Sequence, residues 1–422
     1  MVGQFILVPT RRALGHNGPQ LLSNRPAFMP FTHAFAAPSH VTDPSEAPGL
    51  FACGAQSARS ALRAWACVAL VACLLSPSAF AAKPKKSKTP TNKSALAAKS
   101  YRNDLRVREA ARQIAERQGL SLGWVRTTLA QAQKLPEVVR AASPVADPGV
   151  RNWDAYRRRV LDPVRIQAGV RFWQANAATL ARAQQQSGVD AGTIVGILGA
   201  ETLYGQRMGK YRVLDALATL AFDFPPQHPK AAGRSAYFLQ ELEAFLLWSR
   251  QTGRDPLTVR GSYAGAMGMA QFMPSSWQKY AVDFDGDGRI DLFGSSADAI
   301  GSVANYLAAF GWTSGMPTHF SVALDMARAD LPALLEKDIV PSMTPAQMQA
   351  LGALLPAAAL AHSGLLALVE LPQGLGANPS YVVGTDNFYT VTRYNWSSFY
   401  ALSVIELGQA VQANLPAPKT PD

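Results

Sequence analysis

The stretch Ile194-Val195-Gly196-Ile197-Leu198-Gly199-Ala200-Glu201 determines how the centre of this chain folds. Its large aliphatic residues at 194, 197 and 198 follow the spacing of one helix face, and Glu201 comes at i+7 on that face. The pattern predicts a compact apolar helix over residues 189–202 that carries one carboxyl among aliphatic neighbours. Burial and the carboxyl end of a helix both disfavour the charged form, so the pKa of Glu201 should be raised, which suits a general acid. The alternative is a glutamate at a helix end that pairs with an arginine such as Arg207.

Outward from this helix, the pattern is mostly helical with a small late sheet. Apolar residues recur at helical spacing, with breaks at Gly119, Pro136 and Pro163, over residues 105–139, 153–186, 237–250, 297–310 and 397–411. A capping box that begins at Thr344 predicts one more helix start. Strand-like segments bounded by Gly and Pro turns occupy residues 365–371, 381–383 and 388–392. We therefore expect a mainly α (α+β) protein.

The composition excludes several classes of enzyme chemistry. The chain has 422 residues, of which 48% are hydrophobic and 16% charged, enough for two or three subdomains. Its three cysteines, Cys53, Cys67 and Cys73, all lie within the first 73 residues. No HExxH, GxSxG or P-loop motif occurs in the sequence, so we expect no metal-hydrolase, serine-hydrolase or nucleotide chemistry.

The amino-terminal region has the features of an export signal. Two arginines precede an apolar run over residues 64–75, and Ala79-Phe80-Ala81 supplies an A-x-A cleavage site before Ala82. The run is too short to span a bilayer comfortably. We expect the mature protein in the periplasm of a Gram-negative bacterium. The alternative is an outer-membrane lipoprotein, because Leu70-Val71-Ala72-Cys73 resembles a lipobox that would anchor the protein through Cys73.

Most of the positive charge lies outside the expected folded part. The whole chain carries a formal charge of +11, and removal of residues 1–81 leaves +8. Six of these charges are lysines in the Pro/Ser/Thr-rich stretch before Tyr101, so about +2 remains for the folded part. This stretch is typical of a flexible basic linker. We therefore expect no nucleic-acid partner.

A loop at residues 283–291 has the spacing of a calcium site. Acids at positions 1, 3, 5 and 9 and a glycine at position 6 match the first two-thirds of an EF-hand: Asp283, Asp285, Asp287, Asp291 and Gly288. The glutamate usual at position 12 is missing, but Asp298 could complete the ligand shell from the following helix. These acids would repel one another without a cation, so we expect one structural Ca²⁺ site. The alternative is a solvated turn rich in Asp and Gly.

Longer ordered motifs extend from about Trp153 to the carboxyl end: Gly199-Ala-Glu201-Thr202-Leu-Tyr204-Gly205, Val213-Leu-Asp215-Ala216-Leu217, Gly261-Ser262-Tyr-Ala-Gly265-Ala-Met-Gly268-Met-Ala-Gln271-Phe-Met-Pro274, Asp298-Ala-Ile-Gly301-Ser-Val-Ala-Asn305-Tyr306 and Asn387-Phe-Tyr-Thr-Val-Thr-Arg393-Tyr394-Asn395. These motifs give the chain a resemblance to the lytic murein transglycosylase B family of peptidoglycan-cleaving enzymes. It implies a lysozyme-like catalytic core with a helical subdomain and a small β-containing subdomain. It also implies cleavage of the β-1,4 bond between N-acetylmuramic acid (MurNAc) and N-acetylglucosamine (GlcNAc).

In this family the MurNAc C6 hydroxyl, rather than water, attacks and leaves a 1,6-anhydro end. Glu201 matches the catalytic acid that then serves as base. The resemblance further implies a set of substrate-binding residues: Ser262, Gln271, Tyr156, Tyr306, Tyr394, Asn395, Tyr400 and Arg234. The implied calcium ligands are Asp283, Asp285, Asp287, the Arg289 carbonyl and Asp298. The sequence departs from the family pattern before Arg234, where the chain is longer, and by one extra residue before Asp298.

The resulting division of the chain is a leader over residues 1–81, a linker over 82–103, a helical subdomain over 104–190, a catalytic core over 191–316, a β-containing subdomain over 317–395 and a carboxyl-terminal helix and tail over 396–422. Peptidoglycan strands are the expected partner of a monomer, with other cell-wall enzymes as further candidates and a membrane only if Cys73 carries lipid. Two other functions stay open. One is a muramidase that transfers the sugar to water, and the other is a non-catalytic wall-binding protein.

Overall fold

Two helices pack closely against each other through glycines within the main hydrophobic core. Helix α7 (Ala191–Thr202) contacts α16 (Ser398–Ala413) along its length. A Cβ added at Gly196 would clash with the Val404 carbonyl, and one added at Gly408 would clash with Gly192, so the two backbones approach as only glycine permits. Almost all of α7 is buried, as its apolar pattern predicts. This close packing fixes the relation between the carboxyl end of α7 and the first turn of α16.

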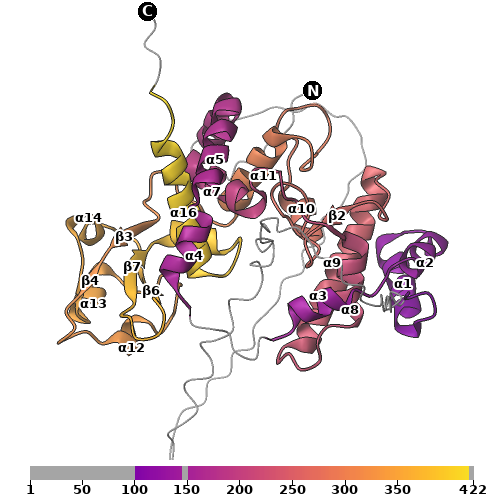
Figure 1. Ribbon diagram of the computed structural model, residues 1–422, viewed down its shortest axis with the longest axis horizontal. Helices are drawn as coiled ribbons and strands as arrows, with labels where there is room; N and C mark the ends of the chain where they lie inside the picture. Colours follow the sequence, from indigo (N-terminus) through magenta and orange to yellow (C-terminus); the bar gives the residue numbers. More distant parts are fainter. Residues whose placement is uncertain (1–99, 145–150, 418–422) are drawn as a thin grey trace, which may run out of the picture. The chain divides into compact units, whose positions relative to one another are not determined.

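The structure, a computed structural model, describes residues 100–144 and 151–417 (Figure 1). The other helices of these ranges are α1 (Leu105–Gln118), α2 (Leu122–Ala130), α3 (Pro136–Ala142), α4 (Trp153–Val160), α5 (Pro163–Ala175), α6 (Ala177–Ser187), α8 (Val213–Phe222), α9 (Ala231–Thr252), α10 (Pro274–Tyr280), α11 (Ser296–Ala309), α12 (Leu331–Leu334), α13 (Pro345–Ala350), α14 (Ala357–Leu360) and α15 (Asp386–Thr392). The expected signal peptide, the lipobox with Cys73 and most of the linker lie outside the described residues. No helix in these two ranges combines the length and the apolar character that crossing a bilayer requires.

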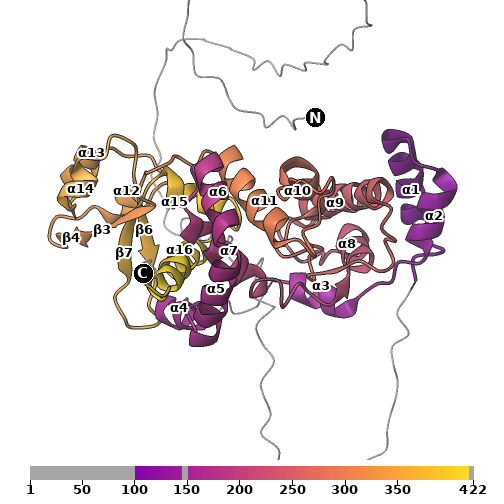
Figure 2. The same cartoon turned by 90° about the horizontal axis from the view of Figure 1, so that it is seen from above.

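The strands are short and entirely antiparallel within the described ranges. Strand β1 (Tyr211–Arg212) pairs with β2 (Arg260–Gly261). A three-stranded sheet has the order β3 (His319–Ser321), β7 (Ser380–Gly384), β6 (Ala367–Leu371), and β4 (Ala323–Leu324) pairs with β5 (Ala353–Leu354). Figure 2 shows α12, α13 and α14 gathered near these strands. This region has a small hydrophobic core of its own, separate from the main core. The small core includes Met348, Leu366, Leu368 and Val383.

Most of the expected elements are confirmed, and their ends lie where the local signals predict. Gly119 closes α1 in the left-handed conformation that favours glycine, with φ 62°. Pro136 and Pro163 each begin a new helix, and Thr344 forms the expected capping box. The strand expected over residues 388–392 is wrong, because these residues belong to α15. Thr385 caps this helix by accepting from the Asn387 amide, and burial of both Phe388 and Val391 follows a helical rather than an alternating pattern.

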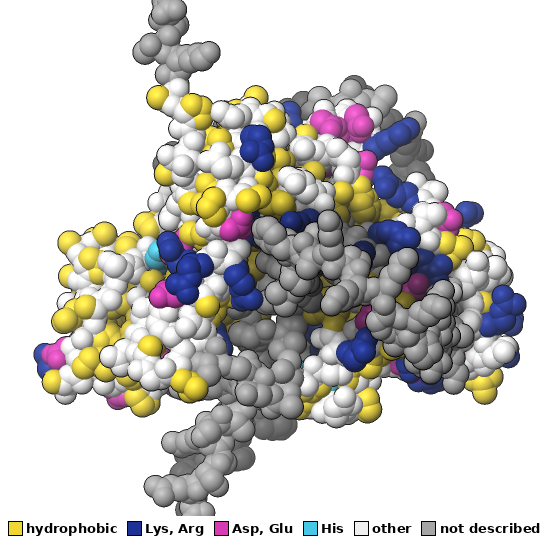
Figure 3. All heavy atoms as spheres, in the orientation of Figure 1, with side chains coloured by type: hydrophobic (Ala, Val, Ile, Leu, Met, Phe, Trp, Pro, Cys, Tyr) yellow, Lys and Arg dark blue, Asp and Glu magenta, His cyan; other side chains and the backbone are white. Residues whose placement is uncertain are grey.

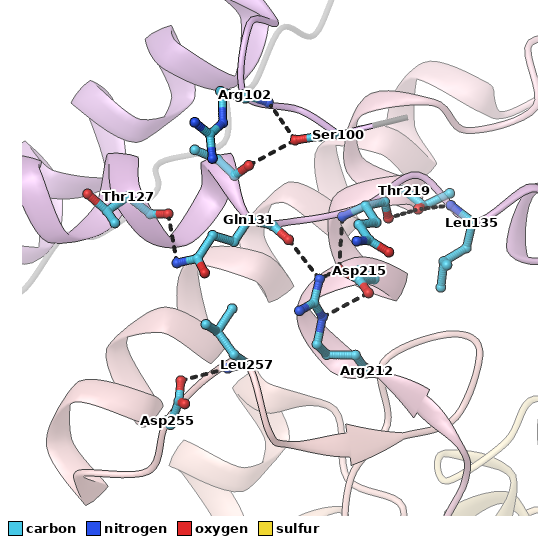
Figure 4. Close-up of polar contacts among 12 residues, drawn as sticks. Ser100, Arg102, Thr127, Gln131, Leu135, Arg212, Asp215, Thr219, Asp255 and Leu257 are labelled. Carbon is cyan, nitrogen blue, oxygen red and sulfur yellow. Dashed lines mark hydrogen bonds and ion pairs between the residues drawn. The ribbon is translucent and has the colours of Figure 1, made fainter. Parts of the chain in front are cut away.

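The helices that precede α4 join the core through polar contacts. The Gln133 amide donates to Asp215 Oδ1 at 2.9 Å, and the Leu135 amide donates to Thr219 Oγ1 at 3.0 Å (Figure 4). Arg117 forms an ion pair with Glu243 at 2.6 Å. These contacts place the α2–α3 connection against α8, next to the β1–β2 pair.

Candidate active site

Glu201 lies in the last turn of α7, where the chain turns sharply. Leu203 and Tyr204 both adopt positive φ angles, 51° and 57°, which non-glycine residues seldom do. The turn is held because the Thr202 hydroxyl donates to the Met269 carbonyl at 2.8 Å and accepts from the Gly205 amide. Strained backbone of this kind persists only where the surroundings enforce it, and it often marks a functional site.

The Glu201 carboxyl is buried and has one hydrogen bond. The residue is 6% exposed. The Tyr400 hydroxyl donates to Oε1 at 2.6 Å, whereas Oε2 is buried with no partner among the described residues. Burial raises the pKa of Glu201 to about 7, and the hydrogen bond from Tyr400 opposes this shift only in part. The carboxyl is therefore partly protonated near neutral pH, and within residues 100–144 and 151–417 no hydrogen bond engages Oε2.

Tyr400 is placed by the first turn of α16. Ser397 caps this helix by accepting from the Tyr400 amide at 3.3 Å, and the preceding Phe399 packs its ring on Trp153 and Tyr156 at centroid distances of 5.4 Å and 5.6 Å. Burial and the nearby Glu201 charge hold the pKa of Tyr400 well above its usual value. Tyr400 therefore stays protonated and keeps donating to Glu201. Tyr156 lies close to the same centre, because its ring packs on Phe399, which precedes Tyr400.

Ser262 and Gln271 are both buried in the loop between β2 and α10. Gln271 has a φ of 49°, and its Nε2 donates to the carbonyls of Gly268 and Met208 at 2.9 Å and 3.2 Å. The Ser262 Oγ accepts from the Ala266 amide at 3.0 Å. The structure therefore gives both side chains a role in shaping this loop, and Thr202 ties the loop to the end of α7.

Tyr306 and Tyr394 lie in one aromatic cluster, with ring centroids 4.9 Å apart. The Tyr394 hydroxyl donates to the Ala270 carbonyl, and burial together with the Glu201 charge raises the pKa of Tyr394. The Tyr306 hydroxyl donates to the Arg393 carbonyl at 2.7 Å. Asn395, half-buried, follows Tyr394 in the turn before α16. The structure thus brings Tyr394 and Tyr400 to Glu201, whereas Tyr306 supports Tyr394 from within the core.

Comparison with known proteins agrees with this arrangement. The family model described as Transglycosylase SLT domain matches residues 103–409. The chain belongs to this transglycosylase family. It is 41% identical over 319 residues to membrane-bound lytic murein transglycosylase B of Escherichia coli, which covers 74% of this chain and 84% of that protein. The resemblance drawn from the sequence motifs is confirmed, and the protein is an enzyme of the lytic transglycosylase class.

Solved lytic transglycosylases have the same fold. The soluble enzyme SltB1 of Pseudomonas aeruginosa matches with a TM-score of 0.66 and 36% identity, over 73% of this chain and 98% of that one. The E. coli enzyme Slt35, solved with calcium, matches with a TM-score of 0.65 and 39% identity, over 74% of this chain and 94% of that one. P. aeruginosa SltB3, solved with a NAG-anhNAM-pentapeptide, matches with a TM-score of 0.61 and 31% identity, over 74% and 82%. The expected mainly α fold with a lysozyme-like catalytic core is confirmed.

Arg234 lies in the first turns of α9, which begins earlier than the expected helix at residue 237. Its guanidinium stands 5.5 Å from the Tyr237 ring centroid and 5.1 Å from that of Phe238. Arg234 therefore packs on aromatic rings of its own helix, and no contact joins it to Glu201 among the described residues.

Sequence reasoning assigned no role to Tyr204, although its ring supports the turn after Glu201. This ring stacks on Phe172 at 5.1 Å, and a Cβ at Gly169 or Gly199 would collide with it. Its buried hydroxyl has no hydrogen-bond partner among the described residues. The sequence feature that could have indicated this role is a large aromatic residue next to a helix that contains several glycines. An aromatic ring often packs where glycines lack a side chain.

The acidic loop brings together three of the four implied carboxylate ligands. Oxygens of Asp283, Asp285 and Asp287 all lie within 4.8 Å of one another. Glycine amides at 286 and 288 donate to Asp283 at 2.7 Å and 2.8 Å, which bends the loop so that the carboxylates converge. A convergent set of carboxylate oxygens is the donor set that Ca²⁺ prefers, so these residues fit the ion.

Asp298, the fourth implied carboxylate ligand, braces the acidic loop from α11. It is 1% exposed, and its two oxygens accept from the amides of Phe284 and Asp291 at 2.7 Å and 2.8 Å. It therefore braces both ends of the acidic loop from α11 and lies outside the group of three converging carboxylates. The Arg289 amide donates to Asp287 at 2.8 Å.

Proposed function

We propose that this enzyme cleaves the β-1,4 bond between MurNAc and GlcNAc in peptidoglycan and leaves 1,6-anhydroMurNAc ends. The observation that carries the proposal is the Glu201 carboxyl, which has a raised pKa, one oxygen held by Tyr400 and the other without a hydrogen-bond partner among the described residues. Such a group can give a proton and then take one back, because its two states lie close in free energy near neutral pH.

The reaction uses Glu201 twice. In the first step Oε2 gives its proton to the glycosidic oxygen, the bond from that oxygen to MurNAc C1 breaks with its electron pair, and GlcNAc leaves as an alcohol. The Tyr400 hydroxyl stabilises the carboxylate that forms. In the second step the C6 oxygen forms a bond to C1 and its proton passes to Glu201. The enzyme returns to its starting state and no water is consumed.

A single carboxyl favours this route over hydrolysis. Glycoside hydrolysis normally needs a second carboxylate about 5–10 Å from the first, to act as base or nucleophile. Among the described residues, burial and the Tyr400 hydrogen bond alone shift the pKa of Glu201, and no neighbouring carboxylate contributes. Asp215 and Asp223, two acids that follow Glu201 in the sequence, are engaged elsewhere by Arg212 and by Tyr101. Within the part of the chain that the structure describes, a muramidase mechanism would therefore have no evident base.

The remaining implied residues form the sugar-binding surface. Tyrosine rings cover the apolar faces of sugars and their hydroxyls can bond sugar oxygens, which suits Tyr156 and Tyr394. Tyr306 acts through its packing on Tyr394. Ser262, Gln271 and Asn395 supply polar groups near the cleaved bond, and Arg234 faces the lactyl or peptide part of the substrate.

We further propose that the acidic loop binds one Ca²⁺ through Asp283, Asp285, Asp287 and the Arg289 carbonyl. The converging oxygens and the calcium in the Slt35 structure support this assignment. When bound, the ion would neutralise the loop charges and stabilise the loop, with no part in the chemistry. Asp298 would hold the loop in the binding conformation rather than complete the ligand shell.

The chain is proposed to be exported to the periplasm, where it acts on peptidoglycan strands as a monomer. The subdomain limits are proposed to be those expected from the sequence. The E. coli relative is named as membrane-bound, which keeps the lipoprotein alternative through Cys73 relevant. Mass spectrometry of the intact protein from membrane and periplasmic fractions separates the two. Cleavage before Ala82 gives an unmodified soluble chain, whereas a lipid mass on Cys73 supports the anchor.

The test of the reaction is mass spectrometry of peptidoglycan digested by residues 82–422. The proposal predicts fragments that lack the mass of one water relative to reducing muropeptides. Glu201→Gln should release none, whereas the exposed Glu336→Gln, a matched carboxyl-to-amide change, should release them normally. Reducing ends would move the protein to the muramidase function, and no cleavage by the wild type would leave a wall-binding protein.

A further inference from the structure

A shallow cavity of about 420 Å³, open to solvent, lies beside the β1–β2 pair, apart from the residues assigned to the reaction. This size is within the range of small-ligand sites. Its lining combines two basic residues, Lys210 and Arg260, with one acidic residue, Glu137, and with the apolar surfaces of Leu135, Leu257 and Tyr211. On the face shown in Figure 3, Lys and Arg side chains form several separate groups among acidic ones, so charge alone singles out no binding face. The geometry of the cavity does.

One wall of the cavity is a closed ion pair. Arg212 Nε donates to Asp215 Oδ2 at 2.8 Å, and Arg212 also donates to the Gln131 carbonyl at 2.7 Å. Figure 4 shows this guanidinium between Gln131 and Asp215, with Leu257 to one side. Asp215 is 5% exposed and accepts from the Gln133 amide as well. Because this pair is satisfied and tied to three chain segments, it provides a rigid, neutral wall rather than a ligand-binding charge.

The other three charges are available to a ligand. Lys210 and Arg260 are exposed, and neither forms an ion pair within residues 100–144 and 151–417. The Arg260 Nη1 donates to the Lys210 carbonyl at 2.8 Å, and the Lys210 ammonium lies 5.6 Å from the Tyr211 ring centroid, so both cations are held at this rim. Glu137, in the first turn of α3, likewise has no ion pair in those ranges. A cavity with two free cations and one free anion is complementary to a zwitterionic group.

The cavity adjoins the proposed sugar-binding surface. Arg260 precedes Ser262 by two residues, and Lys210 follows Met208, whose carbonyl accepts from Gln271, by two residues. Two residues of extended chain span about 7 Å, and a five-residue peptide spans roughly 17 Å. A peptide stem attached to a sugar in the cleft could therefore reach the cavity.

We propose that this cavity binds the portion of a peptidoglycan stem that carries a carboxylate and an ammonium together, as the side chain of a diamino acid does. The inference rests on the proposed function, because it assumes a peptide-bearing glycan in the cleft. Lys210 and Arg260 bind the carboxylate, Glu137 binds the ammonium, and the two leucines with Tyr211 contact the methylene chain between them.

The test measures binding without turnover. The full mature chain carrying Glu201→Gln is titrated by calorimetry with a synthetic stem tripeptide that ends in diaminopimelate. Lys210→Ala and Arg260→Gln, made separately, should each weaken binding about tenfold, the loss of one charge-assisted contact. Acetylation of the side-chain amine of the tripeptide should weaken its binding to the parent. It should not weaken binding to the Glu137→Gln variant any further, because that variant lacks the carboxylate that binds the ammonium. Arg328→Ala, an exposed arginine of the β-containing region, is the matched control and should bind as the parent does.

Equal affinity of the cavity variants and the parent, or no binding of the tripeptide to the parent, would overturn the proposal. The failure of the proposed function gives a different result, since it abolishes glycan cleavage without changing the calorimetric titration. A second measurement compares kcat/KM for peptide-bearing and peptide-free glycan strands. The preference for peptide-bearing strands should fall about tenfold in Lys210→Ala, and an unchanged preference would contradict the assignment.

Discussion

Glu201 and the acidic loop present carboxylates in opposite surroundings. Glu201 stands alone at the end of an apolar helix, 6% exposed, with one hydrogen bond. Asp283, Asp285 and Asp287 stand together on a loop, two of them exposed, and their oxygens accept from backbone amides of the same loop. The pKa of Glu201 is raised by burial, whereas that of Asp285 is lowered, first by the hydrogen bond from Ser295. Isolation keeps a proton available for chemistry, and clustering keeps negative charge available for a cation.

The largest expected effect comes from replacing Glu201 by a residue that cannot transfer a proton. Glu201→Gln keeps the shape of the side chain but cannot give or take a proton, so kcat should fall by about 10³–10⁴-fold. Release of anhydro fragments over time measures the loss. Glu336→Gln serves as control, and a residual rate within tenfold of wild type would show that another group is the acid.

The same substitution should stabilise the protein at high pH. A carboxyl with a folded pKa of about 7 and an unfolded value near 4.5 gives its full contribution to stability below pH 4.5 and loses it as pH rises through 7. Gln does not titrate, so the variant does not lose stability in this way as the pH rises. The free energy of unfolding of Glu201→Gln minus that of the wild type should therefore increase by about 3 kcal/mol from pH 4 to pH 8. Urea unfolding at both pH values measures it. A difference that does not change with pH would mean that Glu201 is not kept protonated by burial.

Calcium removal should destabilise the wild type in proportion to how far the ion exceeds its dissociation constant. At a hundredfold excess the expected loss on chelation is about 2.7 kcal/mol. Asp283→Asn should lower this calcium-dependent stabilisation, while Asp154→Asn, an exposed acid on α4, should leave it intact. Thermal unfolding with calcium and with chelator compares them. If wild type unfolds at the same temperature in both, the loop is a solvated turn.

The smallest effect should come from Tyr400→Phe. Because the hydrogen bond from Tyr400 lowers the pKa of Glu201, its loss should raise that pKa further and move the basic limb of the kcat/KM profile to higher pH. The rate should fall about tenfold, as expected for one hydrogen bond to a charged group. Tyr381→Phe on β7 is the control. If the basic limb of the kcat/KM profile has the same midpoint in Tyr400→Phe as in the wild type, Tyr400 does not affect the pKa of Glu201.

The sequence predicted the parts of the site that depend on local spacing. Helical periodicity placed Glu201 on a buried face, and the alternating acids predicted the convergence of Asp283, Asp285 and Asp287, because both patterns lie within one short element. Helix ends marked by Gly119, Pro163 and Thr344 followed for the same reason.

What the sequence missed depends on contacts between distant segments. The hydrogen bond from Tyr400 to Glu201 joins residues 199 positions apart, and it follows from the close packing of α7 on α16. The bracing role of Asp298 arises from amides on both sides of the loop, which spacing alone does not show. The β-rich composition of residues 388–392 gave the wrong element because a cap at Thr385 and tertiary packing outweigh strand propensity.

A direct titration of the Glu201 carboxyl tests the central claim, that burial keeps this one group protonated near neutral pH. Carboxyl ¹³C shifts of the glutamate-labelled protein, recorded from pH 3 to pH 9 and assigned by comparison with Glu201→Gln, give its pKa. The account predicts a midpoint of about 7, well above the ordinary glutamate value. A midpoint near 4.5 would mean that Glu201 is charged at neutral pH and cannot give the first proton.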